Sequence, residues 1–348
     1  MWGDIAIAFL LAFIVSFMAT PWSISLAKKV NAIDIPKDDR RMHKNSMPKL
    51  GGIAVIAGFL IAVIYLIFVM NLEGTIDLIT DTYYLKLLGI FLGIIVIAIT
   101  GYIDDTKGLK PLQKLLGQAI AAVIVVASGV AIDQIDIPLL DKVGLSVEFS
   151  YILTIIWIIG ITNAINLMDG LDGLSSGISL ISCISLLIIF ALNGSGILSI
   201  IMTAALIGAI VGFLPFNVAP AKTYIGDIGS NFLGFMISII SILGVAKTYT
   251  IAVIVLPILV LGLPILDVVF AVVRRIKNGK SLKAIFKADT GHVHHKLIKK
   301  GFSQKQAVFI LYGASAVLGM FAIIILESRN LEGNIIFING NCCSCFRI

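Results

Sequence analysis

The segment that decides the fold is Tyr151–Gly173, which reads YILTIIWIIGITNAINLMDGLDG. Its first half is apolar from Ile152 to Ile161, whereas its second half ends in a group of Asn and Asp residues. A helix needs about 20 residues to cross a hydrocarbon core roughly 30 Å thick, and the apolar part with its flanks provides that length. The segment therefore predicts a membrane-spanning helix that ends in polar chemistry.

Similar apolar runs recur along all 348 residues, of which 59% are hydrophobic and only 13% charged. Ordinary soluble domains carry about 25% charged residues, so a soluble fold is excluded. The runs lack the alternating pattern of barrel strands, and backbone groups in lipid must bond within their own segment, so the runs are helices. We expect an all-α, polytopic membrane bundle of about ten transmembrane helices, with room for a degenerate eleventh. The predicted spans are 3–26, 50–70, 84–102, 112–131, 150–167, 172–192, 196–214, 229–246, 249–273 and 305–326.

Orientation follows from Lys and Arg, which favour cytoplasmic loops. They gather in alternate loops, so we place 27–50, 102–114, 167–173, 215–228 and 274–304 in the cytoplasm and the N-terminus outside. The first run is too long for a signal-peptide core and is expected to remain as an anchor. We predict one catalytic domain over 1–326, a short tail over 327–348, and a multi-pass location in the bacterial cytoplasmic (inner) membrane. The net charge of +6 lies beside the membrane ends, which favours anionic lipid and phosphate partners over nucleic acid.

Polar residues that suit catalysis collect in the cytoplasmic loops. Asp104 and Asp105 follow directly on an apolar run, and a hard divalent cation with substrate phosphates would relieve their mutual repulsion. The alternative is a pair of solvated acids that marks a helix end beside Lys107 and Lys110.

The second group continues the opening segment. Asn163, Asn166, Asp169 and Asp172 follow at three-residue steps, so a helical backbone would place them on one face as a ligand-binding edge. Polar groups inside a membrane usually face a cavity or a partner helix. Hydrogen bonding between helices is therefore the alternative for Asn163 and Asn166.

A third group surrounds the start of the predicted span 229–246. Asn217 and Lys222 precede Gly226-Asp227, where glycine permits close approach of a ligand and free amides at a helix start suit phosphate. Asp227 then fits a metal ligand and Lys222 a phosphate neutraliser. The alternative makes Asp227 a simple N-cap.

All four histidines also lie in the predicted cytoplasmic loops. His43 belongs to a basic turn, and His292, His294 and His295 lie in the string DTGHVHHK. We favour phosphate recognition or proton transfer for them, with zinc binding and a solvated loop as alternatives. The four cysteines show no recognisable ligand spacing.

Together these strings resemble the polyprenyl-phosphate N-acetylhexosamine-1-phosphate transferases over Arg40 to Gln306. The elements appear in order along the chain: Arg40-x-x-His43, Pro48-x-x-Gly51-Gly52, Asp104-Asp105, NAINLMDGLDGL, FNVAPAKTYIGDIGS and DTGHVHHKL. The histidine string is similar to the branch that uses UDP-GlcNAc rather than the muramoyl-pentapeptide branch. Relatives of this branch usually have an eleventh helix, whereas residues 331–348 look too short to span.

The resemblance implies an enzyme that transfers N-acetylglucosamine 1-phosphate from UDP-GlcNAc to undecaprenyl phosphate, with Mg²⁺ as cofactor and Mn²⁺ as an alternative. It also implies that Asp227 binds Mg²⁺ and that Asp104 and Asp105 serve the lipid phosphate and the metal. Asn166, Asp169 and Asn217 would hold the uridine and the diphosphate.

Three other functions remain open from the sequence. A phospho-MurNAc-pentapeptide-type transferase would use a different UDP-amino sugar. A secondary transporter would place ionisable groups near the membrane midplane, which Asp267 fits. A prenyltransferase of the UbiA type would use Asp and Mg²⁺, but the Asp104-Asp105 string lacks its third acid. The glycan supplied and assembly as a homodimer are also open.

Overall fold

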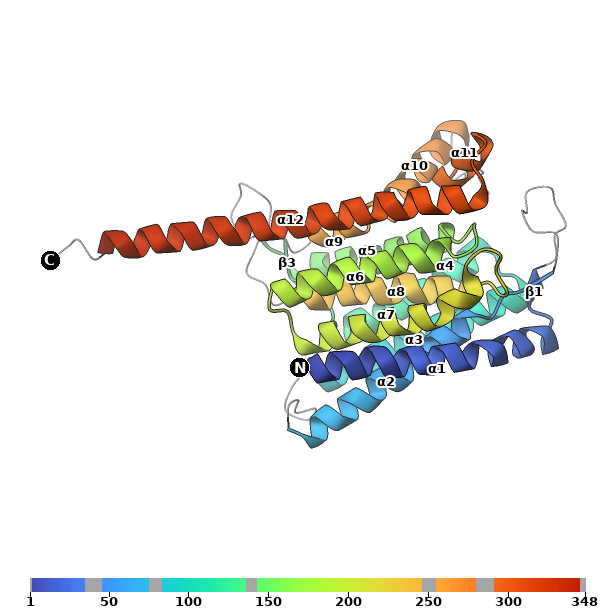
Figure 1. Cartoon of the computed structure of the whole chain (residues 1–348), viewed down its shortest axis with the longest axis horizontal. Coiled ribbons are helices and arrows are strands. Elements are labelled where there is room, and N and C mark those ends of the chain that lie inside the picture. Colours follow the sequence, from blue (N-terminus) through green and yellow to red (C-terminus); the bar gives the residue numbers. More distant parts are fainter. Residues whose placement is uncertain are drawn as a thin grey trace.

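The computed structural model describes residues 2–34, 46–74, 83–135, 143–245, 255–279 and 291–344 (Figure 1). Helices dominate this part of the chain, and most of them lie side by side as a bundle. The helices are α1 (Trp2–Lys29), α2 (Gly52–Leu72), α3 (Tyr83–Lys107), α4 (Pro111–Ala127), α5 (Val147–Leu167), α6 (Leu174–Leu192), α7 (Ile197–Asn217), α8 (Gly226–Val245), α9 (Val255–Val260), α10 (Gly262–Gly279), α11 (Val293–Lys299) and α12 (Gln304–Ser344).

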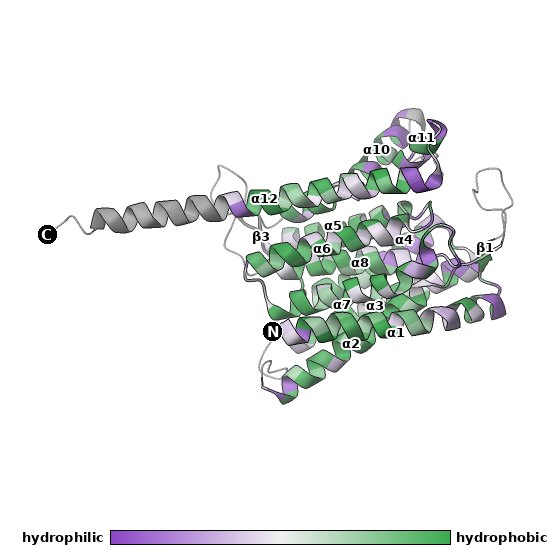
Figure 2. Ribbon diagram, in the orientation of Figure 1, coloured by the Kyte–Doolittle hydropathy of each residue, from purple (hydrophilic) through white to green (hydrophobic). Residues whose placement is uncertain are grey.

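Eight helices of the described chain are long and apolar enough to cross a membrane. They are α1, α2, α3, α5, α6, α7, α8 and the Gln304–Ser328 part of α12, while α4 is apolar but shorter. Figure 2 shows the apolar residues along the length of the bundle and many of the hydrophilic ones near α10 and α11. The predicted all-α polytopic membrane fold is confirmed.

The predicted continuous helix over 249–273 is wrong within its described part. That part forms α9 and α10, with Leu261 between them. Pro264 explains the interruption, because proline has no backbone N–H to continue the helix and is tolerated only in a first turn. The predicted span 305–326 agrees with the Gln304–Ser328 part of α12, although the helix itself continues to Ser344.

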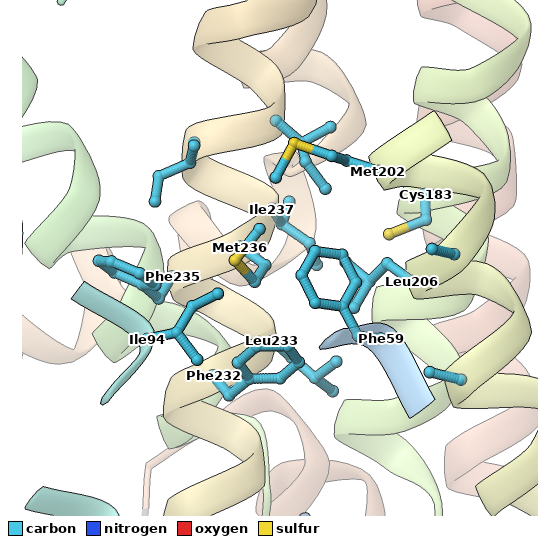
Figure 3. Packing of buried hydrophobic residues seen from close by; sticks show 14 of the residues in the cluster. Phe59, Ile94, Cys183, Met202, Leu206, Phe232, Leu233, Phe235, Met236 and Ile237 are labelled. Atoms are coloured by element: carbon cyan, nitrogen blue, oxygen red, sulfur yellow. The ribbon is translucent and has the colours of Figure 1, made fainter. Parts of the chain in front are cut away.

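Helix α8 is the centre of the bundle, in contact with α2, α3, α5, α6 and α7. Its side chains Phe232, Phe235 and Met236 are fully buried, and the Phe232 ring lies 5.5 Å from that of Phe59 on α2 (Figure 3). Because water is excluded around α8, polar residues at its start lie at the edge of a packed apolar core.

Two short hairpins, absent from the sequence prediction, join helices at opposite ends. Strand β1 (Ile33–Asp34) pairs antiparallel with β2 (Met47–Pro48), and β3 (Gln134–Ile135) pairs with β4 (Val143–Gly144). β1 lies at the end of the bundle where α10 and α11 lie, whereas β3 and the N-terminus lie toward the other end (Figure 1). The first hairpin therefore belongs to the end that carries the predicted site.

Candidate active site

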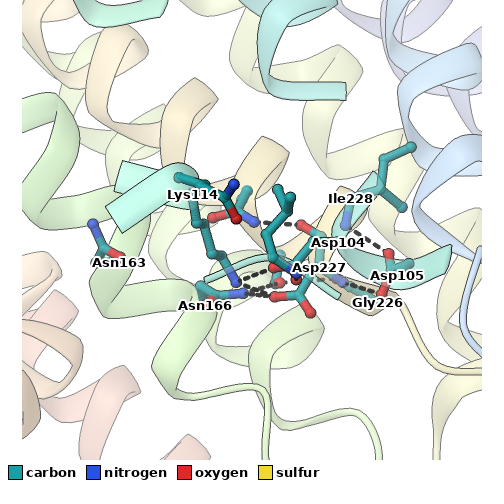
Figure 4. A network of polar contacts seen from close by, with 12 residues as sticks. Asp104, Asp105, Lys114, Asn163, Asn166, Gly226, Asp227 and Ile228 are labelled. Atoms are coloured by element: carbon teal, nitrogen blue, oxygen red, sulfur yellow. Dashed lines mark hydrogen bonds and ion pairs between the residues drawn. The ribbon is translucent and has the colours of Figure 1, made fainter. Parts of the chain in front are cut away.

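Asp105 fixes the start of α8 to the end of α3. Its Oδ1 accepts from the backbone N–H of Asp227 at 3.0 Å and its Oδ2 from that of Ile228 at 2.9 Å (Figure 4). Gly101 makes this approach possible, because a Cβ there would overlap the backbone of Ile228. The expectation that the first amides of this helix are free for phosphate is therefore wrong for these two residues.

Asp227 is held by groups from two other helices. Its Oδ1 accepts from the Lys114 ammonium of α4 and from Asn166 Nδ2 of α5 at 2.7 Å. Lys114 also lies 3.1 Å from Asp104 Oδ2, so one cation lies between two carboxylates (Figure 4). Asp104 Oδ1 accepts from the Leu109 N–H at 2.8 Å, which fixes the turn between α3 and α4.

A chain of side-chain amides runs from Asn163 to the backbone of Asp227. Asn163 Nδ2 donates to Gln118 Oε1 at 2.6 Å, Gln118 Nε2 donates to Asn231 Oδ1 at 2.9 Å, and Asn231 Nδ2 donates to the Asp227 carbonyl at 2.7 Å. The structure therefore gives Asn163 the helix-to-helix role that the sequence left as an alternative.

A cavity of about 310 Å³ opens beside these carboxylates. It is lined by six of the predicted residues, namely Asp105, Asn166, Asp169, Asp172, Asp227 and His295. Its other lining residues are Asp34, Lys49, Gly170, Leu171, Tyr224, Gly226 and Gln304. Five of the six sequence strings quoted above therefore contribute residues to the lining of this one cavity.

The turn between α5 and α6 forms one wall of the cavity. Ser175 Oγ donates to Asp169 Oδ1 at 2.7 Å, and burial raises the pKa of the Asp169 carboxyl from 3.8 to about 7. Asp172 Oδ2 accepts from the Ala221 N–H at 3.1 Å, which ties this turn to the loop before α8. Tyr312 of α12 donates its hydroxyl to the Gly173 carbonyl at 2.5 Å.

Asn217 and Lys222 are not brought to the cavity. Asn217 is buried, where it accepts from Ser176 Oγ at 2.8 Å and donates to the Thr223 carbonyl at 3.0 Å. The Lys222 ammonium lies over the Phe216 ring, 5.8 Å from its centroid. These contacts shape the loop over 217–223, and the predicted contacts of both residues with substrate stay predictions.

The Pro48-x-x-Gly51-Gly52 turn pairs with the residues just before α8. Tyr224 N donates to the Pro48 carbonyl at 2.8 Å, and Gly51 N donates to the Tyr224 carbonyl at 3.1 Å. Gly226, at φ +72°, lies so close that a Cβ there would overlap the Lys49 carbonyl. This pairing brings Lys49 to the cavity, where its ammonium lies 3.6 Å from Asp34 Oδ1.

The three described histidines occupy three different surroundings. His292 pairs with Asp267, with 2.7 Å between Nδ1 and Oδ2, and His295 lines the cavity. His294 is buried against Gly170, and this burial lowers the pKa of its imidazole from 6.5 to about 4. His43 and Asp289 lie outside the described residues, so the predicted role of His43 stays a prediction.

The donor set suits a divalent cation that is shared with a phosphate substrate. In the described chain, no three His, Cys, Asp or Glu side chains are grouped to hold a metal alone. All the contacts of the Asp227 side chain above reach Oδ1, so Oδ2 is its available oxygen. Mg²⁺ typically uses one or two carboxylates together with substrate phosphates, and Asp227 fits that pattern. Both oxygens of Asp105 already accept N–H bonds, so its predicted metal contact stays a prediction.

Sequence reasoning missed several residues of the site. Lys114 belongs to the basic loop over 102–114, from which the sequence indicates orientation alone, yet its ammonium lies between two carboxylates. Gln118 and Asn231 are amides within apolar helices, which is a signal for an interior polar role. Asp34, Lys49, Tyr224 and Gln304 reach the cavity through tertiary contacts that no local pattern reveals.

Comparisons with known proteins find relatives that match most of this chain. A family model described as glycosyl transferase family 4 matches residues 87–245. The probable undecaprenyl-phosphate N-acetylglucosaminyl 1-phosphate transferase of Bacillus subtilis (strain 168) is 36% identical over 325 residues, covering 92% of this chain and 85% of that protein. The decaprenyl-phosphate N-acetylglucosaminephosphotransferase of Mycobacterium leprae (strain TN) is 31% identical over 332 residues, covering 89% and 80%. The phospho-N-acetylmuramoyl-pentapeptide-transferase of Halalkalibacterium halodurans is 27% identical over 333 residues, covering 90% and 95%.

Proposed function

We propose, from the premise that this chain belongs to glycosyl transferase family 4, that it transfers N-acetylglucosamine 1-phosphate from UDP-GlcNAc to undecaprenyl phosphate. The products would be undecaprenyl-diphospho-GlcNAc and UMP. The observation that carries this function is that Asp227, paired with the Lys114 ammonium, meets the 169–172 turn and Lys49 at one cavity. A phosphoryl transfer between two anions needs such cationic and metal-binding groups near a nucleotide-sized space.

The reaction is a displacement at phosphorus. An oxygen of the lipid phosphate attacks the sugar-bearing phosphorus of UDP-GlcNAc, and the bond from that phosphorus to the UMP oxygen breaks. Mg²⁺, when bound, would neutralise charge on the diphosphate and on the departing UMP. Asp227 would hold it through Oδ2.

Other residues of this chain position the reacting groups. Lys114, which lies between Asp104 and Asp227, supplies a positive charge where negative charge collects during transfer. The second pKa of a phosphate monoester is about 6, so the lipid phosphate is mostly deprotonated at neutral pH and needs little help from a base. Asp104 would therefore orient the acceptor rather than remove its proton.

The cytoplasmic side of the inner membrane is the proposed location of the cavity. Lys49, Lys107, Lys110 and Lys222 lie in loops or at a helix end on the same side of the spans as the cavity. The positive-inside rule places such basic segments in the cytoplasm. UDP-sugars are charged and water-soluble, so a site at this face would meet its donor directly.

Two alternatives rank lower. The phospho-MurNAc-pentapeptide-type reaction would share the same carboxylates and differ in the donor. Asp267, the residue that best fitted a transporter, has both carboxylate oxygens bonded to His292 and the Val293 N–H. This pairing favours a structural role over ion transport.

The test is UMP release by purified protein in detergent, with UDP-GlcNAc and undecaprenyl phosphate, with Mg²⁺ and after chelation. We expect release to need the lipid and the metal, and Asp227→Asn to reduce the rate at least 100-fold. Asp133→Asn, an exposed acid in a different loop, is the matched control and should retain the wild-type rate. Folded protein that releases no UMP from UDP-GlcNAc, but does so from UDP-MurNAc-pentapeptide, would overturn the donor assignment.

A further inference from the structure

Asp267 is a buried carboxylate outside the cavity, and both of its oxygens fix the start of another helix. Oδ2 lies 2.7 Å from His292 Nδ1, and Oδ1 accepts from the Val293 N–H at 2.9 Å. Asp267 is 2% exposed and His292 is 5% exposed. The pair therefore joins α10 to the first residue of α11 in a setting that water barely reaches.

A buried carboxylate destabilises a fold unless it is fully partnered, and losing one partner of such a pair is costly. Here the partners come 25 and 26 residues later in the chain. The Asp267–His292 pair thus does more than satisfy a charge, because it sets where α11 begins relative to α10.

Helix α11 connects this pair to the cavity. His294 packs so closely on Gly170 that a Cβ at that glycine would overlap the imidazole. The adjacent His295 lines the cavity, and its ring centroid lies 4.2 Å from that of His294. His292, which is bonded to Asp267, and His295, which lines the cavity, are only three positions apart in the sequence.

We infer that Asp267 is a positioning residue for the nucleotide-sugar donor: through His292 it holds α11 so that His295 faces the cavity beside the 169–172 turn. This inference rests on the proposed function, because it takes the cavity as the donor site. Asp267 itself does not line the cavity, so its effect on the donor must pass through α11.

A double-mutant cycle tests the inference, because residues that act through one another give non-additive effects. The variants are Asp267→Asn, His295→Ala and both together, assayed for the KM of UDP-GlcNAc, the KM of undecaprenyl phosphate and kcat. We expect each single variant to raise the donor KM at least fivefold while the lipid KM stays within twofold. The double variant should be no worse than the more affected single variant. Asp133→Asn is again the matched control.

Several outcomes would overturn the inference. They are multiplicative effects of the two substitutions, an unchanged donor KM in Asp267→Asn, or equal rises in both KM values. Should Asp267→Asn fail to fold, the same cycle with His292→Asn decides, because that variant leaves Asp267 bonded to the Val293 N–H. If the wild-type protein releases UMP from UDP-GlcNAc but the variants give one of these outcomes, the inference fails while the proposed function stands. If the wild-type protein releases no UMP, the proposed function itself fails.

Discussion

Asp104 and Asp105 are neighbours in the sequence but differ in what they bind. Asp105 accepts two backbone N–H bonds from the start of α8, whereas Asp104 contacts Lys114 and the Leu109 N–H. The sequence shows a pair of acids and predicts a shared role at the metal and lipid phosphate. Only the packing of α3 against α8 and α4 distinguishes Asp105, which holds the start of α8, from Asp104, which pairs with the Lys114 ammonium.

The two acids should therefore respond differently to the same substitution. Asp105→Asn replaces one acceptor with an amide N–H that opposes a backbone donor, so we expect a loss of about 1–3 kcal/mol in the free energy of unfolding. Asp104→Asn keeps an acceptor for Leu109 and should lose activity with little loss of stability. Thermal unfolding in detergent measures both variants. Equal unfolding temperatures for the two would contradict the helix-holding role of Asp105.

Asp169 predicts a pH-dependent stability. Burial raises the pKa of its carboxyl from 3.8 to about 7, so between these values the folded chain holds a proton that the unfolded chain has lost. The contribution of Asp169 to the free energy of unfolding is therefore largest below pH 3.8, where both states are protonated. This contribution decreases as the pH rises toward 7.

The measurement is the unfolding temperature of wild type and Asp169→Asn between pH 4 and pH 8. The difference between the two proteins isolates Asp169, because the lowered pKa of His294 makes an opposite contribution in the same range. We expect Asp169→Asn to gain stability relative to wild type as the pH rises. Parallel curves would refute the raised pKa.

At the scale of elements, the apolar runs predict the helices well and their junctions poorly. Eight spans follow from hydrophobic length alone, since lipid leaves the backbone few other choices. The interruption between α9 and α10 depends on Pro264 within a largely apolar run, and the β1–β2 hairpin depends on a partner strand. The candidate site was similarly predicted in its carboxylates but missed in Lys114, whose role depends on the distance to Asp104 and Asp227.

Helix α12 should be coupled to the cavity wall through Tyr312. Its hydroxyl donates to the Gly173 carbonyl at 2.5 Å, at the start of α6 and next to the Asp172 turn. Tyr312→Phe removes this bond, so we expect a loss of about 1 kcal/mol in the free energy of unfolding and a raised KM for the donor. Tyr65→Phe, at an exposed tyrosine on α2, is the control. An unchanged donor KM in Tyr312→Phe would show that α12 does not act on this turn.

At the scale of the whole molecule, the charge pattern predicts which end faces the cytoplasm. In a background without the four native cysteines, Lys110→Cys should be protected in intact cells from a membrane-impermeant maleimide. Glu148→Cys, at the start of α5, should be labelled, because it lies at the opposite end of the spans. Both positions are exposed, so accessibility within the protein does not limit labelling. The reverse labelling pattern would invert the proposed orientation.

The pairing of residues 48–52 with residues 223–225 joins two parts of the chain that the ribosome synthesises at well-separated times. Thr223 Oγ1 donates to the Pro48 carbonyl across 175 positions, and the Asp105 bonds to Asp227 and Ile228 span more than 120. Contacts between distant positions are slow to form, because the chain must lose the conformational entropy of a long loop before the contacts can stabilise it. During synthesis, helices α1 to α7 can enter the membrane and pack while the cavity is still incomplete. The chain gains its catalytic centre only when α8 arrives, so a growing chain that stops before α8 carries the membrane scaffold without the chemistry.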